Sequence, residues 1–185
     1  FAAAVFTNLT RDHLDYHGDM EQYFQAKKRL FVLLEERRDA ALGAIVNADD
    51  PWGRRLLRDV GDLDVVSYGC AEDAAVRAVN LDVSAAGCSF DVVSPWGEAT
   101  VRSELKGRFN VSNLLAAFCV GGRVGLAPDR IGTVLNGAAG APGRLQEVPS
   151  SGGFRAFVDY AHTEDALRNV LATLRELTAR RLIVV

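Results

Sequence analysis

The stretch TNLTRDHLDYHGDMEQYFQAKKRLFVLL, residues 7–34, combines a polar turn with the helix that follows it, and the interpretation of the whole chain starts there. Gly18 breaks the chain, and Asp19 with Gln22 three residues later is typical of a helix start. At about 100° per residue, one face of this helix is apolar. That face gathers Met20, Tyr23, Phe24, Leu30, Phe31 and Leu34. Lys27 falls in its middle.

Lys27 is an unusual residue for an apolar helix face, because burial penalises the charged form of an amine. A neutral amine is a nucleophile, and one that adds carbon dioxide becomes a carbamate, an anionic ligand for a metal. The chain has three lysines and eighteen arginines, and a guanidinium cannot undergo this chemistry. The pattern leaves a second interpretation open, in which the Lys27 stem reaches water or its ammonium pairs with a carboxylate.

Two histidines and two aspartates lie in the turn before this helix. His13 and His17 are four residues apart, which on a helical turn places two imidazoles on one side, as a metal site requires. Asp12 and Asp15 would orient these rings or bind the metal directly. On spacing alone, a polar turn whose side chains cap backbone groups is an equal alternative.

Composition is that of a globular protein and argues against two classes of function. The chain has 185 residues, of which 49% are hydrophobic and 24% charged, enough for one large core or parts of two domains. A net charge of −3 without a basic cluster argues against nucleic-acid binding. No apolar run is long enough to predict a membrane span. Cys70, Cys88 and Cys119 lack metal-ligand spacing and are predicted to be reduced core residues of a cytoplasmic protein.

The middle of the chain is predicted to form a parallel sheet that continues into an antiparallel meander. A buried strand at Ala44–Val46 leads into the acidic turn Asn47–Asp50 and a helix at Trp52–Asp59, an arrangement typical of α/β proteins. The acidic turn has two interpretations, the nucleotide side of the sheet or a turn that caps the helix. Short β-prone runs separated by turns follow, with SPWG at residues 94–97 as the clearest turn. These runs are Val65–Tyr68, Val76–Val83, Cys88–Val93 and Ala99–Leu105.

A second helix is predicted from Asn110, as its N-cap, to about Val124. Asn110 and Asn113 share a face, where two carboxamides can read the donor and acceptor edge of adenine, although capping alone explains Asn110. The small residues of Gly137–Arg144 predict a domain boundary, with one domain at 1–141 and the next at 142–185. Arg144 directly follows this turn.

The last segment is predicted to be a βαβ unit. A strand at Phe154–Val158 ends in DYAHT, residues 159–163, and Thr163 caps a helix that runs to about Ala179. Leu182–Val185 is predicted to start the next strand. Asp159 and His162 lie after the carboxyl end of a strand, where open α/β sheets bind ligands and where an aspartate commonly accepts ribose hydroxyls.

These motifs together resemble the Mur ligase family. TNLTRDHLDYHGDMEQYFQAK resembles the middle-domain signature, LKGRFNVSN at residues 105–113 resembles L-x-G-x-F-N-x-x-N, and PGR and DYAHT also match. The resemblance implies that His13 binds magnesium, that Lys27 is carbamylated, and that ATP contacts Asn110, Asn113, Arg144, Asp159 and His162. It implies no chemical role for His17. One departure is Glu164, where the family usually has proline.

The resemblance further implies a central ATP-binding domain followed by the start of a Rossmann-like C-terminal domain. The DHLDYHGD form resembles the ligases that add the third peptide residue, meso-diaminopimelate or L-lysine, to UDP-N-acetylmuramoyl-L-alanyl-D-glutamate through an acyl phosphate, with ATP and Mg²⁺. We expect a cytoplasmic monomer. The family's phosphate loop would precede Phe1 and its D-N-P-R motif would follow Val185, so we expect a piece of a longer protein that is inactive alone.

Three other functions stay open at this point. A folylpolyglutamate-synthetase-like ligase would share the lysine and the nucleotide residues, although the DHLDYHGD form argues against it. A metal-dependent hydrolase would use residues 12–17, would tolerate arginine at position 27 and would not need ATP. A non-catalytic module would bind nucleotide without turnover.

Overall fold

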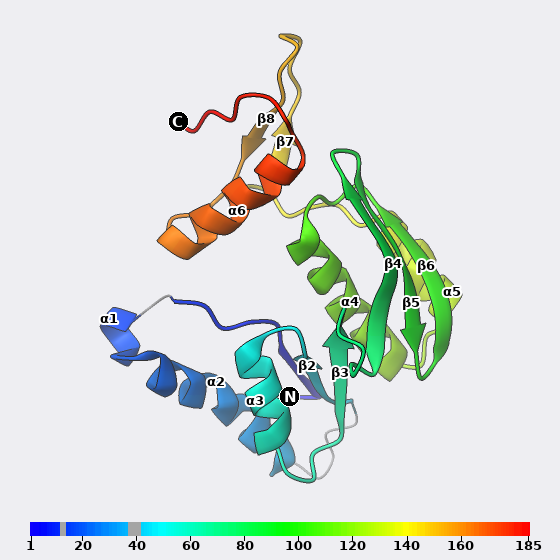
Figure 1. The fold of residues 1–185 in the computed structure, drawn as a ribbon. Helices are drawn as coiled ribbons and strands as arrows, with labels where there is room; N and C mark the ends of the chain where they lie inside the picture. Colours follow the sequence, from blue (N-terminus) through cyan, green and yellow to red (C-terminus); the bar gives the residue numbers. More distant parts are fainter. Residues whose placement is uncertain (12–13, 37–41) are drawn as a thin grey trace.

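The computed structural model describes residues 1–11, 14–36 and 42–185, and its centre is a six-stranded sheet with the order β1-β2-β3-β4-β5-β6 (Figure 1). The strands are β1 Ala3–Phe6, β2 Gly43–Asn47, β3 Val65–Gly69, β4 Val76–Ser84, β5 Gly87–Ser94 and β6 Gly97–Ser103. Strands β1 to β4 pair in parallel, and β4, β5 and β6 pair antiparallel. The predicted parallel sheet with an antiparallel meander is confirmed, but the run Val65–Tyr68, expected in the meander, belongs to β3, which pairs in parallel with β2 and β4.

Helices pack on both faces of this sheet. The described helices are α1 Leu14–His17, α2 Met20–Glu35, α3 Pro51–Asp59, α4 Arg108–Arg123, α5 Pro128–Asn136 and α6 Glu164–Glu176. Because side chains alternate along a strand, β2 contributes to two hydrophobic cores. Ala44 and Val46 lie in the core of α2 and α3, whereas Ile45 lies in the core of α4 and α5.

Helix α2 begins and packs as its sequence predicts. The Asp19 carboxylate accepts a hydrogen bond from the Gln22 backbone N–H at 2.8 Å, and the Gln22 side-chain amide donates to the same carboxylate at 3.1 Å. The predicted apolar face turns to the core. Its buried members are Phe24, Phe31 and Leu34, with Met20, Tyr23 and Leu30 partly buried beside them.

The start of α4 differs from the prediction. Gly107, rather than Asn110, is the N-cap residue, with φ of +88° and no side-chain cap. Glycine reaches this conformation without steric cost, so the helix begins before Asn110. Helix α5 was not among the expected elements. It begins with Pro128, whose fixed φ suits the first helical position.

The C-terminal segment contains a two-stranded sheet and one helix. β7 Gln146–Val148 pairs antiparallel with β8 Ala156–Val158, and α6 begins at its predicted cap, where the Thr163 hydroxyl accepts from the Ala166 N–H at 3.3 Å. Of the predicted βαβ unit, the first strand and the helix are present as β8 and α6, but the second strand is not. Residues Leu182–Val185 form no strand in the described chain, because no neighbouring strand pairs with them.

The cysteines follow the prediction at two positions of three. Cys88 and Cys119 are buried, and burial raises the pKa of their thiols to about 11 and about 12. Cys70 is exposed because it follows the last residue of β3 and opens a loop. Among the described residues, no helix has both the length and the apolar character needed to cross a membrane.

Candidate functional site

One buried carboxamide joins three segments at the edge where β1, β2 and β3 end. Asn47 is the last residue of β2, and its Nδ2 donates to the Thr7 carbonyl at 2.7 Å and to the Ser112 hydroxyl of α4 at 3.3 Å. Its Oδ1 accepts from the Asp49 N–H at 2.9 Å. Ligands of open α/β sheets bind at this kind of edge, so Asn47 fixes the framework of the candidate site.

The two aspartates that follow organise the same edge. Asp49 accepts backbone N–H groups of the loop after β3 at 2.7 and 3.0 Å. Asp50 caps α3 through two N–H groups at 2.9 Å and accepts the Leu9 N–H at 3.3 Å. The acidic turn therefore acts in this structure as a cap and a loop anchor, the simpler of its two interpretations.

Lys27 lies on α2 and has an aromatic partner. Its side chain is half-buried, and its Nζ lies 5.2 Å from the centre of the Tyr23 ring. The ring of His17 also stacks on that of Tyr23, with 4.4 Å between the ring centres and a 12° interplanar angle. No carboxylate among the described side chains forms an ion pair with Lys27.

Two other residues of α2, Glu21 and Lys28, form salt bridges with α3. The Lys28 ammonium lies 2.9 Å from the Asp59 carboxylate, which balances its charge. Glu21 accepts two hydrogen bonds from the Arg55 guanidinium at 2.5 and 2.8 Å, and these bonds lower the pKa of Glu21 to about 2. Of the two neighbouring lysines, Lys27 is thus the one without a described counter-charge.

The predicted magnesium ligand His13 lies outside the described residues, as does Asp12. Among the residues that the structure describes, no group of three or more histidine, cysteine or carboxylate side chains is arranged to hold a metal ion. The metal site therefore stays a prediction.

The two predicted adenine-binding residues contact each other at the start of α4. Asn113 Nδ2 donates to Asn110 Oδ1 at 3.3 Å, and Asn110 Nδ2 donates to the Lys106 carbonyl at 2.9 Å. Asn110 is half-buried and Asn113 is exposed. The Lys106 carbonyl thus orients Asn110, and the Asn113 carboxamide lies on the solvent side of the pair.

Arg144, Asp159 and His162 gather in the C-terminal segment around Tyr160. The Arg144 guanidinium lies 5.3 Å from the centre of the Tyr160 ring, and the His162 ring meets the same ring edge-on at 5.0 Å. Asp159 accepts the Leu145 N–H at 2.7 Å and the Ala161 N–H at 2.8 Å. Tyr160 is part of the DYAHT motif, but the sequence alone predicts no role for it. Its aromatic side chain, two residues before His162, is the feature that could have indicated this contact.

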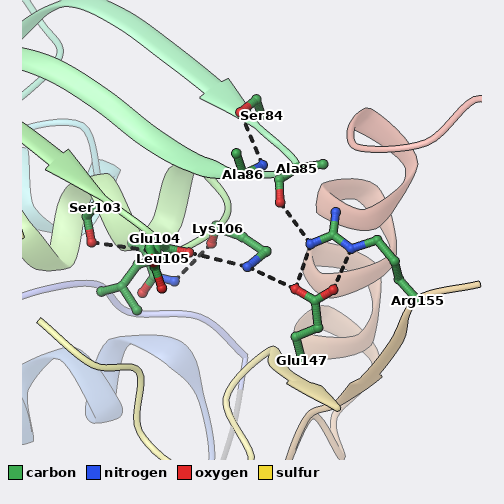
Figure 2. A network of polar contacts seen from close by, with 10 residues as sticks. Ser84, Ala85, Ala86, Ser103, Glu104, Leu105, Lys106, Glu147 and Arg155 are labelled. Atoms are coloured by element: carbon green, nitrogen blue, oxygen red, sulfur yellow. Dashed lines mark hydrogen bonds and ion pairs between the residues drawn. The ribbon is translucent and has the colours of Figure 1, made fainter. Parts of the chain in front are cut away.

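A polar network connects the C-terminal segment to the loop before α4. Figure 2 shows the Glu147 carboxylate between the Lys106 ammonium and the Arg155 guanidinium. The Lys106 pair measures 3.2 Å, and both Arg155 bonds measure 2.6 Å. Hydrogen bonds from Arg155, and secondarily from Lys106, lower the pKa of Glu147 to about 2.

The predicted site residues thus form three separate groups. Lys27 lies on α2, Asn110 with Asn113 on α4, and Arg144 with Asp159 and His162 in the C-terminal segment. Within the described part of the chain, no hydrogen bond or ion pair joins a member of one group directly to a member of another.

Comparisons with known proteins find similar domains, sequences and structures. The model of the Mur ligase middle domain matches residues 1–121, and that of the Mur ligase glutamate ligase domain matches residues 143–185. The chain is 47% identical over 187 residues to the UDP-N-acetylmuramoyl-L-alanyl-D-glutamate–2,6-diaminopimelate ligase of Geobacter metallireducens and 49% identical over 191 residues to that of Geobacter sulfurreducens. Each comparison covers 100% of this chain and 36% of the relative.

A solved structure of a ligase with the same name is also similar. It is 35% identical, with a TM-score of 0.76 over 96% of this chain and 36% of that chain. The chain therefore spans little more than a third of the length of the ligases that it matches.

Proposed function

The chain belongs to the Mur ligase family, and on this premise we propose that it is part of an ATP-dependent ligase that adds 2,6-diaminopimelate to UDP-N-acetylmuramoyl-L-alanyl-D-glutamate. The observation that carries the proposal is 47% identity to the Geobacter metallireducens ligase of that name across the whole chain. L-Lysine is the competing amino acid that a test must include.

The proposed reaction makes one amide bond at the expense of ATP. The side-chain carboxylate of D-glutamate attacks the γ-phosphorus, the bond to the ADP oxygen breaks, and an acyl phosphate forms. The amine of the incoming amino acid then attacks the acyl carbon, phosphate leaves, and the amine loses a proton. Negative charge accumulates between the carboxylate and the phosphates, so electrostatic stabilisation is the main requirement. Magnesium, when bound, supplies positive charge there.

Lys27 and His13 are the proposed holders of magnesium, and the surroundings of Lys27 fit this role. The amine is half-buried and faces a ring, and no described carboxylate neutralises it. Lys28 and Lys106 both pair with carboxylates. Addition of carbon dioxide to the neutral Lys27 amine forms an N–C bond, releases a proton and leaves an anionic oxygen donor, the type of ligand that magnesium prefers.

The remaining proposed residues bind the nucleotide. Asn110 and Asn113 offer carboxamide donors and acceptors to the adenine edge. The Asp159 carboxylate is held by two backbone N–H groups, and its other lone pairs suit ribose hydroxyls. Arg144 and His162, both against Tyr160, offer positive charge and hydrogen-bond donors to the phosphates.

The test of this proposal is the substitution Lys27→Arg in the full-length protein. We expect formation of the UDP-linked tripeptide to fall at least about 100-fold, because arginine keeps the charge but cannot form the carbamate. Product is measured with diaminopimelate, L-lysine and no amino acid, each with and without ATP. Intact-protein mass spectrometry under carbon dioxide reports the added carbamate in the parent protein.

Lys28→Arg is the matched control, because arginine can keep the ion pair with Asp59. It should retain the activity of the parent protein. Equal activities of Lys27→Arg, Lys28→Arg and the parent protein would remove Lys27 from the mechanism. ATP-independent product formation, or none with either amino acid, would refute the proposed reaction.

A further inference from the structure

Glu147 occupies a position at which three distant parts of the chain meet. Its carboxylate, in β7, receives the Arg155 guanidinium of the β7–β8 hairpin and the Lys106 ammonium of the loop before α4. Arg155 Nη2 also donates to the Ala85 carbonyl, in the turn between β4 and β5, at 2.8 Å. Figure 2 shows these four groups side by side, and we name them the Glu147 bridge.

The Glu147 bridge is more enclosed on its Lys106 side than on its Arg155 side. The Lys106 side chain is 13% exposed, whereas those of Glu147 and Arg155 are 37% and 39% exposed. Two parallel bonds from a guanidinium to a carboxylate fix the relative orientation of both groups. An additional bond from the same guanidinium to a backbone carbonyl extends that fixed geometry to the meander.

The Glu147 bridge also lies between the two groups of proposed nucleotide-binding residues. On one side, the Lys106 carbonyl accepts from Asn110, which accepts from Asn113. On the other side, β7 begins directly after Leu145, whose N–H is held by the Asp159 carboxylate. A continuous series of polar contacts and short backbone connections thus joins Asn113 to Asp159.

The other contacts between these parts are few and small. Gly107 approaches α6 so closely that a Cβ on it would lie 2.6 Å from Thr173 Cγ2. Arg108 and Glu176 are 3.9 Å apart and both are well exposed, so this pair contributes little. None of the residues of α6 is buried. In Figure 1, β7, β8 and α6 lie beyond the start of α4 and the β4–β5 turn. None of their residues belongs to either hydrophobic core.

We propose that Glu147 and Arg155 are positioning residues that hold the C-terminal segment against the start of α4 and so place Arg144, Asp159 and His162 relative to Asn110 and Asn113. The inference rests on the proposed function, because it assumes that these five residues bind one ATP molecule. Neither Glu147 nor Arg155 touches the substrate in this role.

The expected kinetic signature is a rise in KM for ATP with a smaller change in kcat. Without the bridge, a smaller fraction of molecules has both groups in place, and apparent affinity falls by that fraction. We expect Glu147→Gln and Arg155→Gln each to raise KM for ATP about 3- to 10-fold. At saturating concentration, ATP binds both groups of nucleotide-binding residues and restores their arrangement. We therefore expect kcat to change less than about twofold.

The experiment uses the full-length protein with spin labels on Val134→Cys in α5 and Ala172→Cys in α6, after Cys70→Ser removes the exposed native thiol. Distance distributions between the labels are measured with and without Mg-ATP, alongside KM and kcat. Glu147→Gln should broaden the distribution without ATP, and ATP should narrow it again. Arg168→Gln is the matched control, because it breaks an ion pair confined to α6 and should change none of these quantities.

A double-mutant cycle links the effect to the network. Lys106→Met combined with Glu147→Gln should raise KM for ATP by less than the product of the single effects, because both remove the same contact. The proposal would be overturned if the effects on KM for ATP were multiplicative, or if Glu147→Gln and Arg168→Gln gave equal distance distributions. A lower thermal midpoint of Glu147→Gln without any change in distance would overturn it as well. If the parent protein lacks ATP-dependent ligation, the proposed function fails, and the distance measurement without ATP still decides whether Glu147 holds the segment.

Discussion

Asn47 illustrates what a single residue adds at the edge of the sheet. The sequence placed an Asx-rich turn after a buried strand, and this much is correct. It did not reveal that the Asn47 carboxamide bonds to Thr7 and Ser112, which are 40 and 65 residues away, because a local pattern contains no information on distant partners. The same holds for Tyr68, whose burial raises the pKa of its phenol and whose hydroxyl donates to the Phe6 carbonyl.

Replacing Asn47 should therefore destabilise the protein. Asn47→Ala removes a buried carboxamide and leaves the Thr7 carbonyl and the Asp49 N–H without their partners, which costs about 1–3 kcal/mol of the free energy of unfolding. Urea denaturation monitored by circular dichroism measures this loss in the free energy of unfolding. Asn169→Ala removes an exposed carboxamide that bonds only within α6 and is expected to cost less than about 0.5 kcal/mol; equal losses for the two variants would contradict this account.

At the scale of elements, the helical period predicted α2 well and predicted the start of α4 less well. The apolar face of α2 has a regular spacing, so its burial follows from the sequence. Lys27 is only half-buried, and its Nζ lies near the ring of Tyr23, which is itself only partly buried. For α4, Asn110 had the better capping side chain, but the backbone freedom of Gly107 determined where the helix begins.

The contact between α2 and α3 should depend on pH through Glu21. Its pKa is about 2 in the folded protein and 4.5 as an ordinary glutamate, because Arg55 binds its charged form. A lowered pKa stabilises the fold above pH 4.5, and this contribution is lost as pH falls toward 2. Urea unfolding at a series of pH values should show a shallower loss of stability in that window for Glu21→Gln than for the parent protein. Glu164→Gln, which removes a carboxylate paired only within α6, should follow the parent protein more closely; identical slopes for both variants would refute the role of Glu21.

The close approach of α4 and α6 gives a separate test with two glycines. Gly107 and Gly125 have φ of +88° and +81°, but only at Gly107 would a Cβ meet another element. Gly125→Ala should cost about 1–2 kcal/mol from backbone strain alone. Gly107→Ala should cost more, and adding Thr173→Ala should recover part of the difference in thermal or urea unfolding. If Gly107→Ala and the double variant with Thr173→Ala were equally stable, the contact with Thr173 would not explain the additional cost.

For the whole molecule, alternation of helical and β-prone segments predicted an α/β fold with a change from parallel to antiparallel strands. What it missed lies in the C-terminal segment, where β7 pairs with β8 and the expected strand at Leu182–Val185 has no neighbouring strand to pair with. Helix α6 has the amphipathic sequence of a packed helix, yet none of its residues is buried. Sequence periodicity shows that a helix has an apolar face but does not identify what covers it.

Hydrogen exchange across the chain should reflect this uneven packing. Helix α4 has eight buried residues and α6 has none, so α6 amides should exchange at least about tenfold faster than α4 amides, since local opening is easiest where few apolar contacts form. Mass spectrometry of deuterated peptic peptides makes the comparison. Equal protection of the two helices would contradict it.

The reversal of strand direction at β4 also affects the order in which the polypeptide acquires its shape. β4, β5 and β6 are neighbours in sequence and are joined by two-residue turns, so they meet at little entropic cost. β1, β2 and β3 meet only after intervening helices close long loops, a slower process. The meander and α4 then provide an early scaffold. We expect the half that carries Lys27 to be completed on it afterwards, so that the surroundings of that amine are among the last parts of the fold to form.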